Sequence, residues 1–198
     1  MSKTVNRSDI DGLLRFLKKT QVATSKELGK FVTARTILGR LVEDGKIQAL
    51  GAGVYATAAL DPFIASVIAT ARFYPNAIIS NLTAMVIHGL SDESIDRIDV
   101  DIVRTTSIRN KLLRVHRVPE SRLAGVERLR FHGSTIRIYD RERSLCEAFL
   151  VDKGGPIFFK ALKRYFKNQK PDSDAILKYD GILKTHVLRH VQQELADA

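Results

Sequence analysis

Cysteine is nearly absent from this sequence: the 198-residue chain contains one, Cys146. A single cysteine excludes an intramolecular disulfide and a multi-cysteine zinc site. The chain also lacks a long apolar run, since its longest apolar stretches, near 63–71 and 84–90, fall well short of the roughly 20 residues that a membrane span needs. Its N-terminus has no apolar signal-peptide core. We therefore expect a cytoplasmic protein with no membrane partner.

Patterns that carry catalysis are missing as well. The "GAG" at 51–53 lacks the strand-to-helix context of a phosphate-binding loop. His186 and His190 are four residues apart on a predicted helix, but Val187 stands where a zinc protease has glutamate. We therefore predict no catalytic residue, no metal site and no cofactor, and expect that the protein is not an enzyme.

Positive charge, by contrast, is plentiful. The chain has 32 Lys and Arg against 22 Asp and Glu, a formal net charge of +10. The excess is concentrated in residues 1–57, with 10 basic and 5 acidic residues, and in residues 104–143, with 11 and 4. Such a balance favours a polyanionic partner, and nucleic acid is the first candidate.

The first 57 residues carry the pattern of three helices followed by a β-hairpin. Ser8 caps the first predicted helix, Thr24 or Ser25 the second, and Thr33 the third, in which apolar residues recur with a period of 3.6. Gly45 ends the third helix, and "KIQAL" and "GVYAT" flank the "GAG" turn. This order is typical of a winged helix-turn-helix, whose third helix enters a DNA groove while the hairpin, or wing, reaches the neighbouring backbone.

Polar side chains on these elements are candidates for contact with DNA. Arg35, near the start of the third helix, is the first candidate for reading a base edge, because a bidentate arginine–guanine pair discriminates by roughly 1 to 3 kcal/mol. Residues on or near the second helix are better placed to hold phosphates. The full predicted set is Ser25, Lys26, Lys30, Thr33, Arg35, Thr36, Arg40, Lys46 and Gln48.

Asp61 and Pro62 provide a cap and a first helical residue, which places a domain boundary near 58–61. We predict a winged helix-turn-helix domain over 1–58 and an α+β domain over 59–198. The second domain begins with helices, one of them capped by Ser80, continues with strands in "SIDRIDVDIV", "LLRVHRV" and "STIRIYD", and ends in helices. The predicted fold class is α+β, with a winged helix-turn-helix followed by a larger mixed α+β domain that has a helical C-terminus.

The basic region of the second domain predicts a further positive surface. Its candidate residues are Arg114, Arg117, Arg137, Arg141 and Arg143. For Arg141 and Arg143, at a predicted helix start, the alternative to binding an anion is pairing with Asp140 and Glu142.

Two alternatives to a DNA-binding regulator remain open. Asp99 and Asp101 share one face of a predicted strand, as the metal-binding carboxylates of some nucleases do, so a metal-dependent nuclease is the first. The acidic residue and lysine that usually accompany such a pair on a neighbouring strand are missing, and solvent-facing aspartates on a half-buried strand are the simpler interpretation. The second alternative is a winged-helix module that binds another protein.

Four segments, in order along the chain, resemble the AbiEi family, the antitoxin component of bacterial type IV toxin-antitoxin systems: "LGRLVEDGKIQALGAGVYA", "ISNLTAMVIHGL", "YDRERSLCEAFL" and the tail from "IFFKALKRYF" to "ILKYDGI". The resemblance implies an N-terminal domain that binds inverted repeats in double-stranded DNA of its own promoter and represses the operon. It also implies a second domain that counters AbiEii, a nucleotidyltransferase-like toxin, without necessarily binding it directly. The wing departs from the family, because Gln48, Ala49 and Ala52 replace basic residues, which leaves more of the phosphate contact to Lys46 and the third helix.

Overall fold

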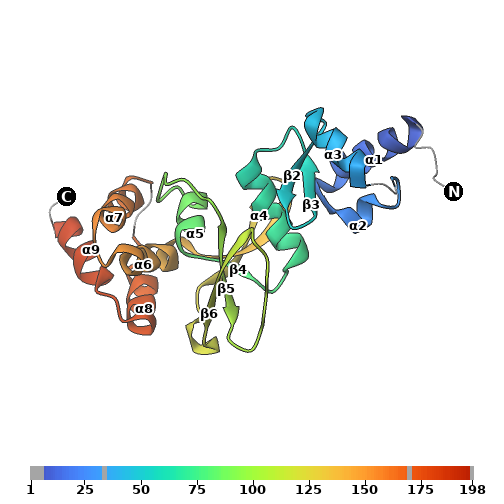
Figure 1. The fold of residues 1–198 in the computed structure, drawn as a ribbon. Helices are drawn as coiled ribbons and strands as arrows, with labels where there is room; N and C mark the ends of the chain where they lie inside the picture. The colour runs from blue at the N-terminus through green and yellow to red at the C-terminus, as the bar shows by residue number, and fades with distance from the viewer. Residues whose placement is uncertain (1–6, 33–34, 169–170, 197–198) are drawn as a thin grey trace. The chain divides into compact units, whose positions relative to one another are not determined.

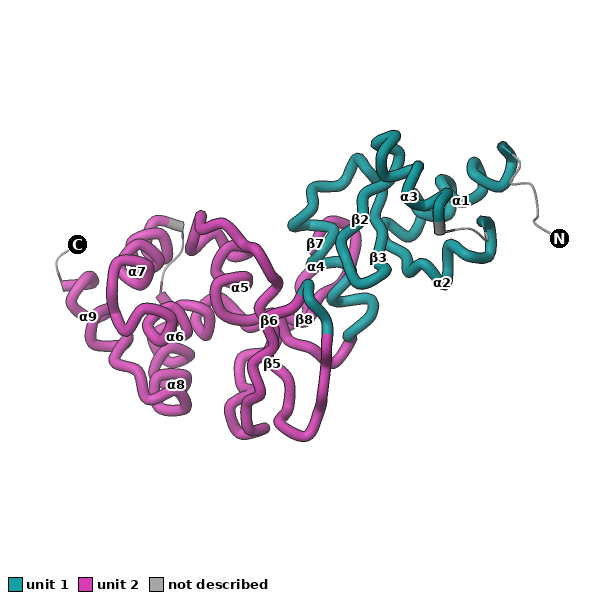
Figure 2. The backbone as a smooth tube through the Cα atoms, viewed as in Figure 1, with its two compact units in different colours: residues 1–74, 110–112 teal, residues 75–109, 113–198 magenta. Residues whose placement is uncertain are grey.

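The computed structural model describes residues 7–32, 35–168 and 171–196, which contain helices and two sheets (Figure 1). The predicted α+β class is confirmed. The chain divides into two compact units (Figure 2). Unit 1 consists of residues 1–74 and 110–112, and unit 2 of residues 75–109 and 113–198.

Unit 1 begins with helices whose apolar faces form one core. They are α1 (Arg7–Thr20), α2 (Ser25–Leu28) and α3 (Arg35–Glu43). Thr24, not Ser25, caps α2: its hydroxyl accepts from the Glu27 amide at 3.2 Å, and the Glu27 carboxylate accepts from the Thr24 amide at 2.8 Å. The predicted cap of α3, Thr33, lies outside the described residues.

A three-stranded antiparallel sheet follows in unit 1. Its strands are β1 (Val22–Thr24), β2 (Ile47–Gly51) and β3 (Val54–Thr57), in the order β1-β3-β2. Gly45 ends α3 as predicted, because its φ of 65° lets the amides of Gly45 and Lys46 donate back to the carbonyls of Val42 and Leu41 at 3.0 and 2.9 Å. Residues 51–53, all with positive φ, form the predicted turn of the β2–β3 hairpin.

α4 (Pro62–Phe73) starts where the sequence predicts and packs on β1 and β2. The Asp61 carboxylate accepts from two amides of its first turn. Arg72, near its end, donates to the Val22 carbonyl and to the Glu27 carboxylate. Unit 1 therefore runs past residue 58, where the sequence places the domain boundary, to residue 74.

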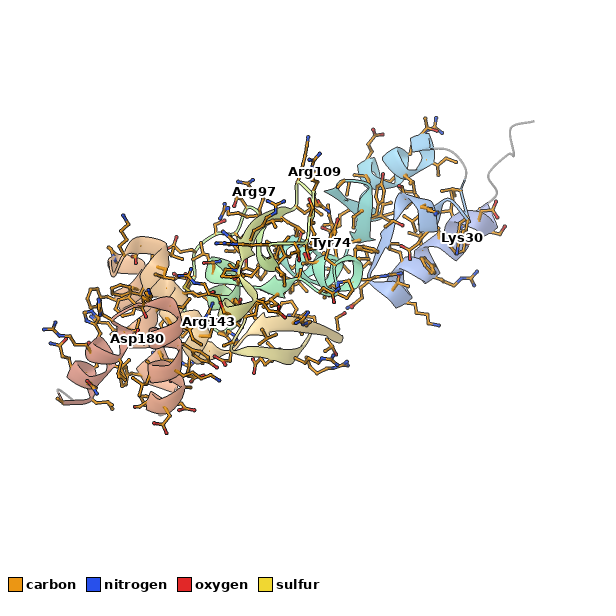
Figure 3. The ribbon with its side chains drawn as sticks, turned by 90° about the horizontal axis from the view of Figure 1, so that it is seen from below. Lys30, Tyr74, Arg97, Arg109, Arg143 and Asp180 are labelled. Carbon is orange, nitrogen blue, oxygen red and sulfur yellow. The ribbon has the colours of Figure 1, made fainter. Side chains whose placement is uncertain are left out.

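A distant piece of the chain completes unit 1. The side-chain amide of Asn110 donates to the hydroxyl of Tyr74, which is labelled in Figure 3, at 2.9 Å. The side chain of Leu112 lies next to Gly51. Residues 110–112 thus belong to unit 1, although the residues on either side of them belong to unit 2.

Unit 2 is built on a five-stranded mixed sheet. Its strands are β4 (Ile78–Ile79), β5 (Ile98–Val103), β6 (Leu113–Val118), β7 (Val126–Phe131) and β8 (Ser134–Tyr139), in the order β6-β5-β4-β8-β7. The β5–β6 and β4–β8 pairs are parallel, and the β4–β5 and β7–β8 pairs are antiparallel. The sequence predicts β5, β6 and β8 but misses β4, which has two residues, and β7, in which charged residues break the apolar alternation.

The helices of unit 2 gather around α6 (Figure 1). They are α5 (Asn81–Ile87), the 3-10 helix η1 (Glu120–Arg122), α6 (Arg141–Asp152), α7 (Pro156–Asn168), α8 (Ser173–Leu183) and α9 (Val187–Ala196). Helices α5, α7, α8 and α9 pack against α6, so residues 143–148 are all buried, including Cys146 as predicted. Ser80 takes the predicted cap position of α5, but its hydroxyl makes no cap bond, and the Asn81 amide donates to Glu147 Oε2 at 2.7 Å instead.

Candidate functional site

The predicted DNA-contacting residues of unit 1 lie on α2, α3 and the start of the hairpin. Lys26, Lys30, Thr36, Arg40 and Lys46 are exposed. Lys46 pairs with Asp44 at 3.2 Å, whereas no described carboxylate lies within ion-pair distance of Lys26 or Arg40. Arg35 is the first residue of α3, and its side chain lies outside the description.

Gln48 and Ser25, two further members of the predicted set, also have contacts within unit 1. The Gln48 side-chain amide donates to the carbonyls of Thr57 and Leu60, at 2.9 and 2.5 Å. Because both donor hydrogens of this amide are used within unit 1, Gln48 is not part of the candidate DNA surface. Ser25 is partly buried, and its backbone amide donates to the Gly53 carbonyl at 2.7 Å, which ties the start of α2 to the hairpin turn.

One of the five arginines predicted as a second basic surface, Arg143, is buried, and three others bond to groups of the protein itself. Arg117 is the exposed member of the set, whereas Arg143 is 1% exposed. Arg141 donates to the Tyr165 carbonyl at 3.0 Å and lies over the Tyr165 ring. Arg137 donates to a backbone carbonyl of residue 76, and Arg114 pairs with a carboxylate of residue 96 at 2.8 Å. Internal contacts therefore hold most of this charge.

Asp99 and Asp101 are buried, each 2% exposed, so the prediction that they face solvent is wrong. The Asp99 carboxylate accepts from the Thr83 hydroxyl at 3.3 Å and lies 3.0 Å from His116 Nε2. It also accepts from Arg114 at 3.5 Å. Its negative charge is thus neutralised by residues of β6, the neighbouring strand.

Asp101 lies one step along the same face of β5. Its Oδ2 accepts from the Tyr139 hydroxyl at 3.0 Å. Its other oxygen, Oδ1, is buried and has no partner among the described residues. A buried acceptor without a hydrogen-bond partner destabilises the folded state, because folding removes its hydrogen bonds to water and supplies none in return.

Arg143 and Glu147 face this carboxylate from α6. They form a buried ion pair one helical turn apart, with Arg143 Nη2 and Glu147 Oε1 separated by 3.3 Å. The guanidinium also lies over the Tyr139 ring, 4.5 Å from its centre. Arg143 Nε and Nη1 are buried without a partner among the described residues. Figure 3 shows Arg143 where the C-terminal helices meet the sheet of unit 2.

These groups line a cavity of about 150 Å³. Its polar wall includes Asp101, His116, Arg143 and Glu147, and Leu150 and Leu183 contribute apolar surface. All of these residues belong to unit 2. The described part of the chain therefore holds a small cavity whose wall includes buried residues of both charge signs.

Burial and hydrogen bonding raise the pKa values of ionisable groups in this polar wall. Desolvation, helped by the nearby Asp101, raises the pKa of Glu147 to about 7, while Arg143 opposes the shift. Desolvation likewise raises the pKa of Asp101. The hydrogen bond with Asp99 raises the pKa of His116 above its usual value. The three groups thus hold protons to a higher pH than they would in the unfolded chain.

We expect the protein to lose stability as the pH rises from about 4.5 to about 7. Glu147 keeps its proton in the folded state up to about pH 7 but loses it near pH 4.5 when unfolded, so folding is favoured below this window. The raised pKa values of Asp101 and His116 act in the same direction. Each proton involved changes the free energy of unfolding by up to about 1.4 kcal/mol per pH unit. Urea unfolding at several pH values measures the slope.

Glu147→Gln should flatten this slope, because it removes the titrating carboxyl and retains an oxygen for the Asn81 amide. Asp92→Asn is the control: hydrogen bonds from Lys160 and Arg164 lower the pKa of Asp92 to about 2, outside the window. A stability that rises with pH over this range, or equal slopes for wild type and Glu147→Gln, would contradict the prediction.

Among the described residues, no group of three or more His, Cys, Asp or Glu side chains could hold a metal ion. Asp99 and Asp101, the pair on which the nuclease alternative depends, are held mainly by Thr83, His116 and Tyr139. His190 packs against aromatic rings, with its ring centre 5.3 Å from that of Phe158. These positions give the nuclease alternative no specific support.

Sequence reasoning missed the pairing of Arg143 with Glu147. It considered Glu142 as a partner for Arg143, whereas Glu142 accepts from the Tyr165 hydroxyl at 2.8 Å. A usable signal was present: Arg and Glu at positions i and i+4 with Leu145, Cys146 and Ala148 around them indicate an ion pair on a buried helix face.

In comparisons with known proteins, no family model matches the chain and no curated protein matches it significantly. Within the residues described, no helix combines the length and the apolar character needed to cross a membrane.

Proposed function

We propose that the protein is a sequence-specific DNA-binding autorepressor and the antitoxin of a type IV toxin-antitoxin system, as its resemblance to the AbiEi family implies. The observation that carries the DNA-binding part is the element order of unit 1. Three helices lead into the β2–β3 hairpin, and β3 lies between β1 and β2 in the sheet. In a winged helix-turn-helix with this order, α3 is the recognition helix and the hairpin is the wing.

Exposed positive charge on these elements supports the proposal. Lys26 and Lys30 lie on and just after α2, and Arg40 is on α3. Lys46 is next to the start of the hairpin. In this arrangement Lys26, Lys30, Arg40 and Lys46 hold phosphates, and Arg35, at the first residue of α3, reads a base edge.

The test is binding of the full-length protein to a labelled fragment of its own upstream DNA and to a scrambled fragment, across a salt series. Affinity for both should fall as salt rises, with a logarithmic slope of about 0.9 for each phosphate contact. Tighter binding to the upstream fragment supports the repressor. Weak, equal binding to both fragments would reject sequence-specific repression and favour the protein-interaction alternative.

Two variants distinguish contacts to phosphates from contacts to bases. Arg40→Ala with Lys46→Ala should weaken binding to both fragments and reduce the salt slope by about 2. Arg35→Ala should reduce the preference for the upstream fragment by about 1 to 3 kcal/mol. The control is Lys163→Ala with Arg189→Ala, which removes two exposed charges from α7 and α9 and should leave both measurements unchanged. Normal binding by the Arg35, Arg40 and Lys46 variants would reject α3 as the recognition helix.

The antitoxin part rests on the resemblance and needs its own test. The gene next to this one should encode a nucleotidyltransferase-like toxin whose expression arrests growth, and co-expression of the full chain should restore growth. Restoration by the Arg40→Ala, Lys46→Ala variant would assign the antitoxin activity to residues outside the DNA surface. Failure of the wild-type chain to restore growth would remove the antitoxin function and leave the repressor proposal intact.

A further inference from the structure

The hairpin of β7 and β8 in unit 2 carries arginines on one face (Figure 2). Arg128 of β7 is directly opposite Arg137 of β8, and Arg130 is two residues further along β7, opposite Thr135. Residues two apart on a strand share a face of the sheet, and so do residues directly opposite on neighbouring strands. Arg128 and Arg130 are exposed, and Arg137 is partly exposed. The three side chains therefore leave the hairpin on one surface, which we call the arginine face.

Within the described residues, no carboxylate lies within ion-pair distance of Arg128, Arg130 or Arg137. Two of these side chains donate to neutral acceptors. Arg137 Nη1 donates to the Asn76 carbonyl at 3.1 Å, and Arg130 Nη1 donates to the Thr135 hydroxyl at 3.3 Å. Such bonds restrict a side chain without cancelling its charge. Because like charges directly opposite on neighbouring strands are destabilising, an anion bound between Arg128 and Arg137 would relieve their repulsion.

The turn of the hairpin adds an exposed aromatic ring. His132 is exposed, and its ring meets the Phe131 ring edge-on, with the ring centres 4.7 Å apart. Positive φ angles at His132 (45°) and Gly133 (84°) form the tight two-residue turn that brings this ring to the tip. An exposed ring held in this way offers a platform on which a flat group of a ligand can stack.

We propose that the hairpin binds single-stranded RNA, with phosphates on the arginine face and a base stacked on His132. Closely spaced arginines suit phosphates, because each guanidinium presents donors in a planar fork that matches the phosphate oxygens. A stacking ring favours a single strand, since unpaired bases are open to aromatic side chains whereas the bases of a duplex are stacked on their neighbours.

The hydroxyl of Thr135 favours RNA over single-stranded DNA. Thr135 is exposed on the arginine face, opposite Arg130. A hydroxyl that accepts one hydrogen bond, as this one does from Arg130, can still donate its own hydrogen. The 2′-hydroxyl of RNA provides an acceptor that DNA lacks.

Protection of a sheet edge is the ordinary alternative role for charges on β7. This strand ends the order β6-β5-β4-β8-β7, and charged side chains on such a strand discourage pairing with another chain. Arg137, however, is on β8, which has a neighbouring strand on each side. Edge protection therefore does not account for the arginine opposite Arg128.

The inference goes beyond the proposed DNA-binding function and does not depend on it, because the arginine face belongs to unit 2 and the DNA surface to unit 1. The experiment uses the full-length Arg40→Ala, Lys46→Ala variant as the parent, which reduces nucleic acid binding by unit 1. The probes are a short, fluorescent, mixed-sequence RNA, single-stranded DNA of the same sequence, and the corresponding duplex DNA. Fluorescence anisotropy across a salt series gives the affinity of each probe.

We expect the parent to bind RNA more tightly than either DNA probe. In the parent background, Arg128→Gln with Arg130→Gln should weaken RNA binding by about tenfold or more. The same change should reduce the logarithmic salt slope by about 1.4, because each phosphate contact to a single strand contributes about 0.7. The matched control is Arg117→Gln with Arg189→Gln, which removes two exposed arginines from β6 and α9 and should leave RNA binding as in the parent.

Two further substitutions test the contacts to the base and to the 2′-hydroxyl. His132→Asn removes the ring but suits the positive φ of the turn, and it should weaken RNA binding by about fivefold or more. Thr135→Val should remove the preference for RNA over single-stranded DNA. Arg128, Arg130, His132 and Thr135 are exposed, so these substitutions should leave the fold intact.

Three results would overturn the inference. They are no binding of RNA by the parent at micromolar concentration, equal losses in the Arg128, Arg130 variant and in the control pair, and RNA binding no tighter than binding of either DNA probe. The second would indicate diffuse attraction to the positive charge of the whole chain. The third would assign the surface to DNA or to polyanions in general.

Discussion

Arg143→Leu should destabilise the protein by about 3 to 5 kcal/mol, the cost of removing one member of a buried ion pair. Arg143 is 1% exposed and pairs with Glu147, which is 4% exposed. Without the guanidinium, the Glu147 carboxylate must either stay charged in an apolar surrounding or take up a proton. The Tyr139 ring would also lose the cation above it. Urea unfolding of the full-length variant at pH 7 measures the loss.

A second substitution tests whether the uncompensated carboxylate is the cause. Arg143→Leu with Glu147→Gln removes both charges but retains an oxygen for the Asn81 amide, so it should recover a large part of the lost stability. Arg117→Leu, at the exposed arginine of β6, should change stability by less than about 0.5 kcal/mol. If Arg143→Leu cost as little as Arg117→Leu, or if the double variant were no more stable than Arg143→Leu, the pair would not be holding the fold.

Gly125→Ala should cost about 2 to 4 kcal/mol, because it adds both backbone strain and a steric clash. Gly125 has a φ of 85°, and a Cβ there would lie 2.9 Å from Cζ of Tyr179 and 3.0 Å from Cβ of Arg143. Neither neighbour can move easily: Tyr179 is 5% exposed and donates its hydroxyl to Asp140, and Arg143 is fixed within α6. The carbonyl of Gly125 also accepts from the Asp140 amide at 2.7 Å.

Gly133→Ala separates the cost of backbone strain from the cost of the steric clash. Gly133 has nearly the same φ, 84°, but nothing lies within 4 Å of the position of its added Cβ. It should therefore show the conformational penalty alone, about 1 kcal/mol. Thermal and urea unfolding of both variants give the difference. Equal losses at the two glycines would mean that the packing of Tyr179 and Arg143 around Gly125 is loose.

Local signals predicted most helices well. The Asp61-Pro62 start of α4 and the glycine end of α3 follow from chemistry within a few residues, and the structure bears them out. The strands were harder to predict from the sequence. β4 has two residues, too few for any alternation, and its place at the centre of the sheet depends on partners from β5 and β8. Such pairing is set by residues far apart in the chain.

The polar cavity was the least predictable part. Ile98, Val100 and Ile102 alternate with aspartates, which is typical of a strand with one face in water. In the structure both faces of β5 are buried, because Thr83, Tyr139 and α6 meet the aspartate side. No local pattern carries that information, since partners for Asp99 and Asp101 come from α5, β6 and β8.

The segment 110–112 has a consequence for dividing this protein into parts. Because unit 1 takes three residues from the connection between β5 and β6, no single cut in the gene yields unit 1 whole. A fragment that ends at residue 74 lacks the Asn110 partner of Tyr74 and the Leu112 side chain beside Gly51, which is in the proposed wing. A fragment that starts at residue 75 would carry these three residues without the surface that they cover. Point substitutions in the full chain, rather than truncations, are therefore the sound way to assign activities to the two units.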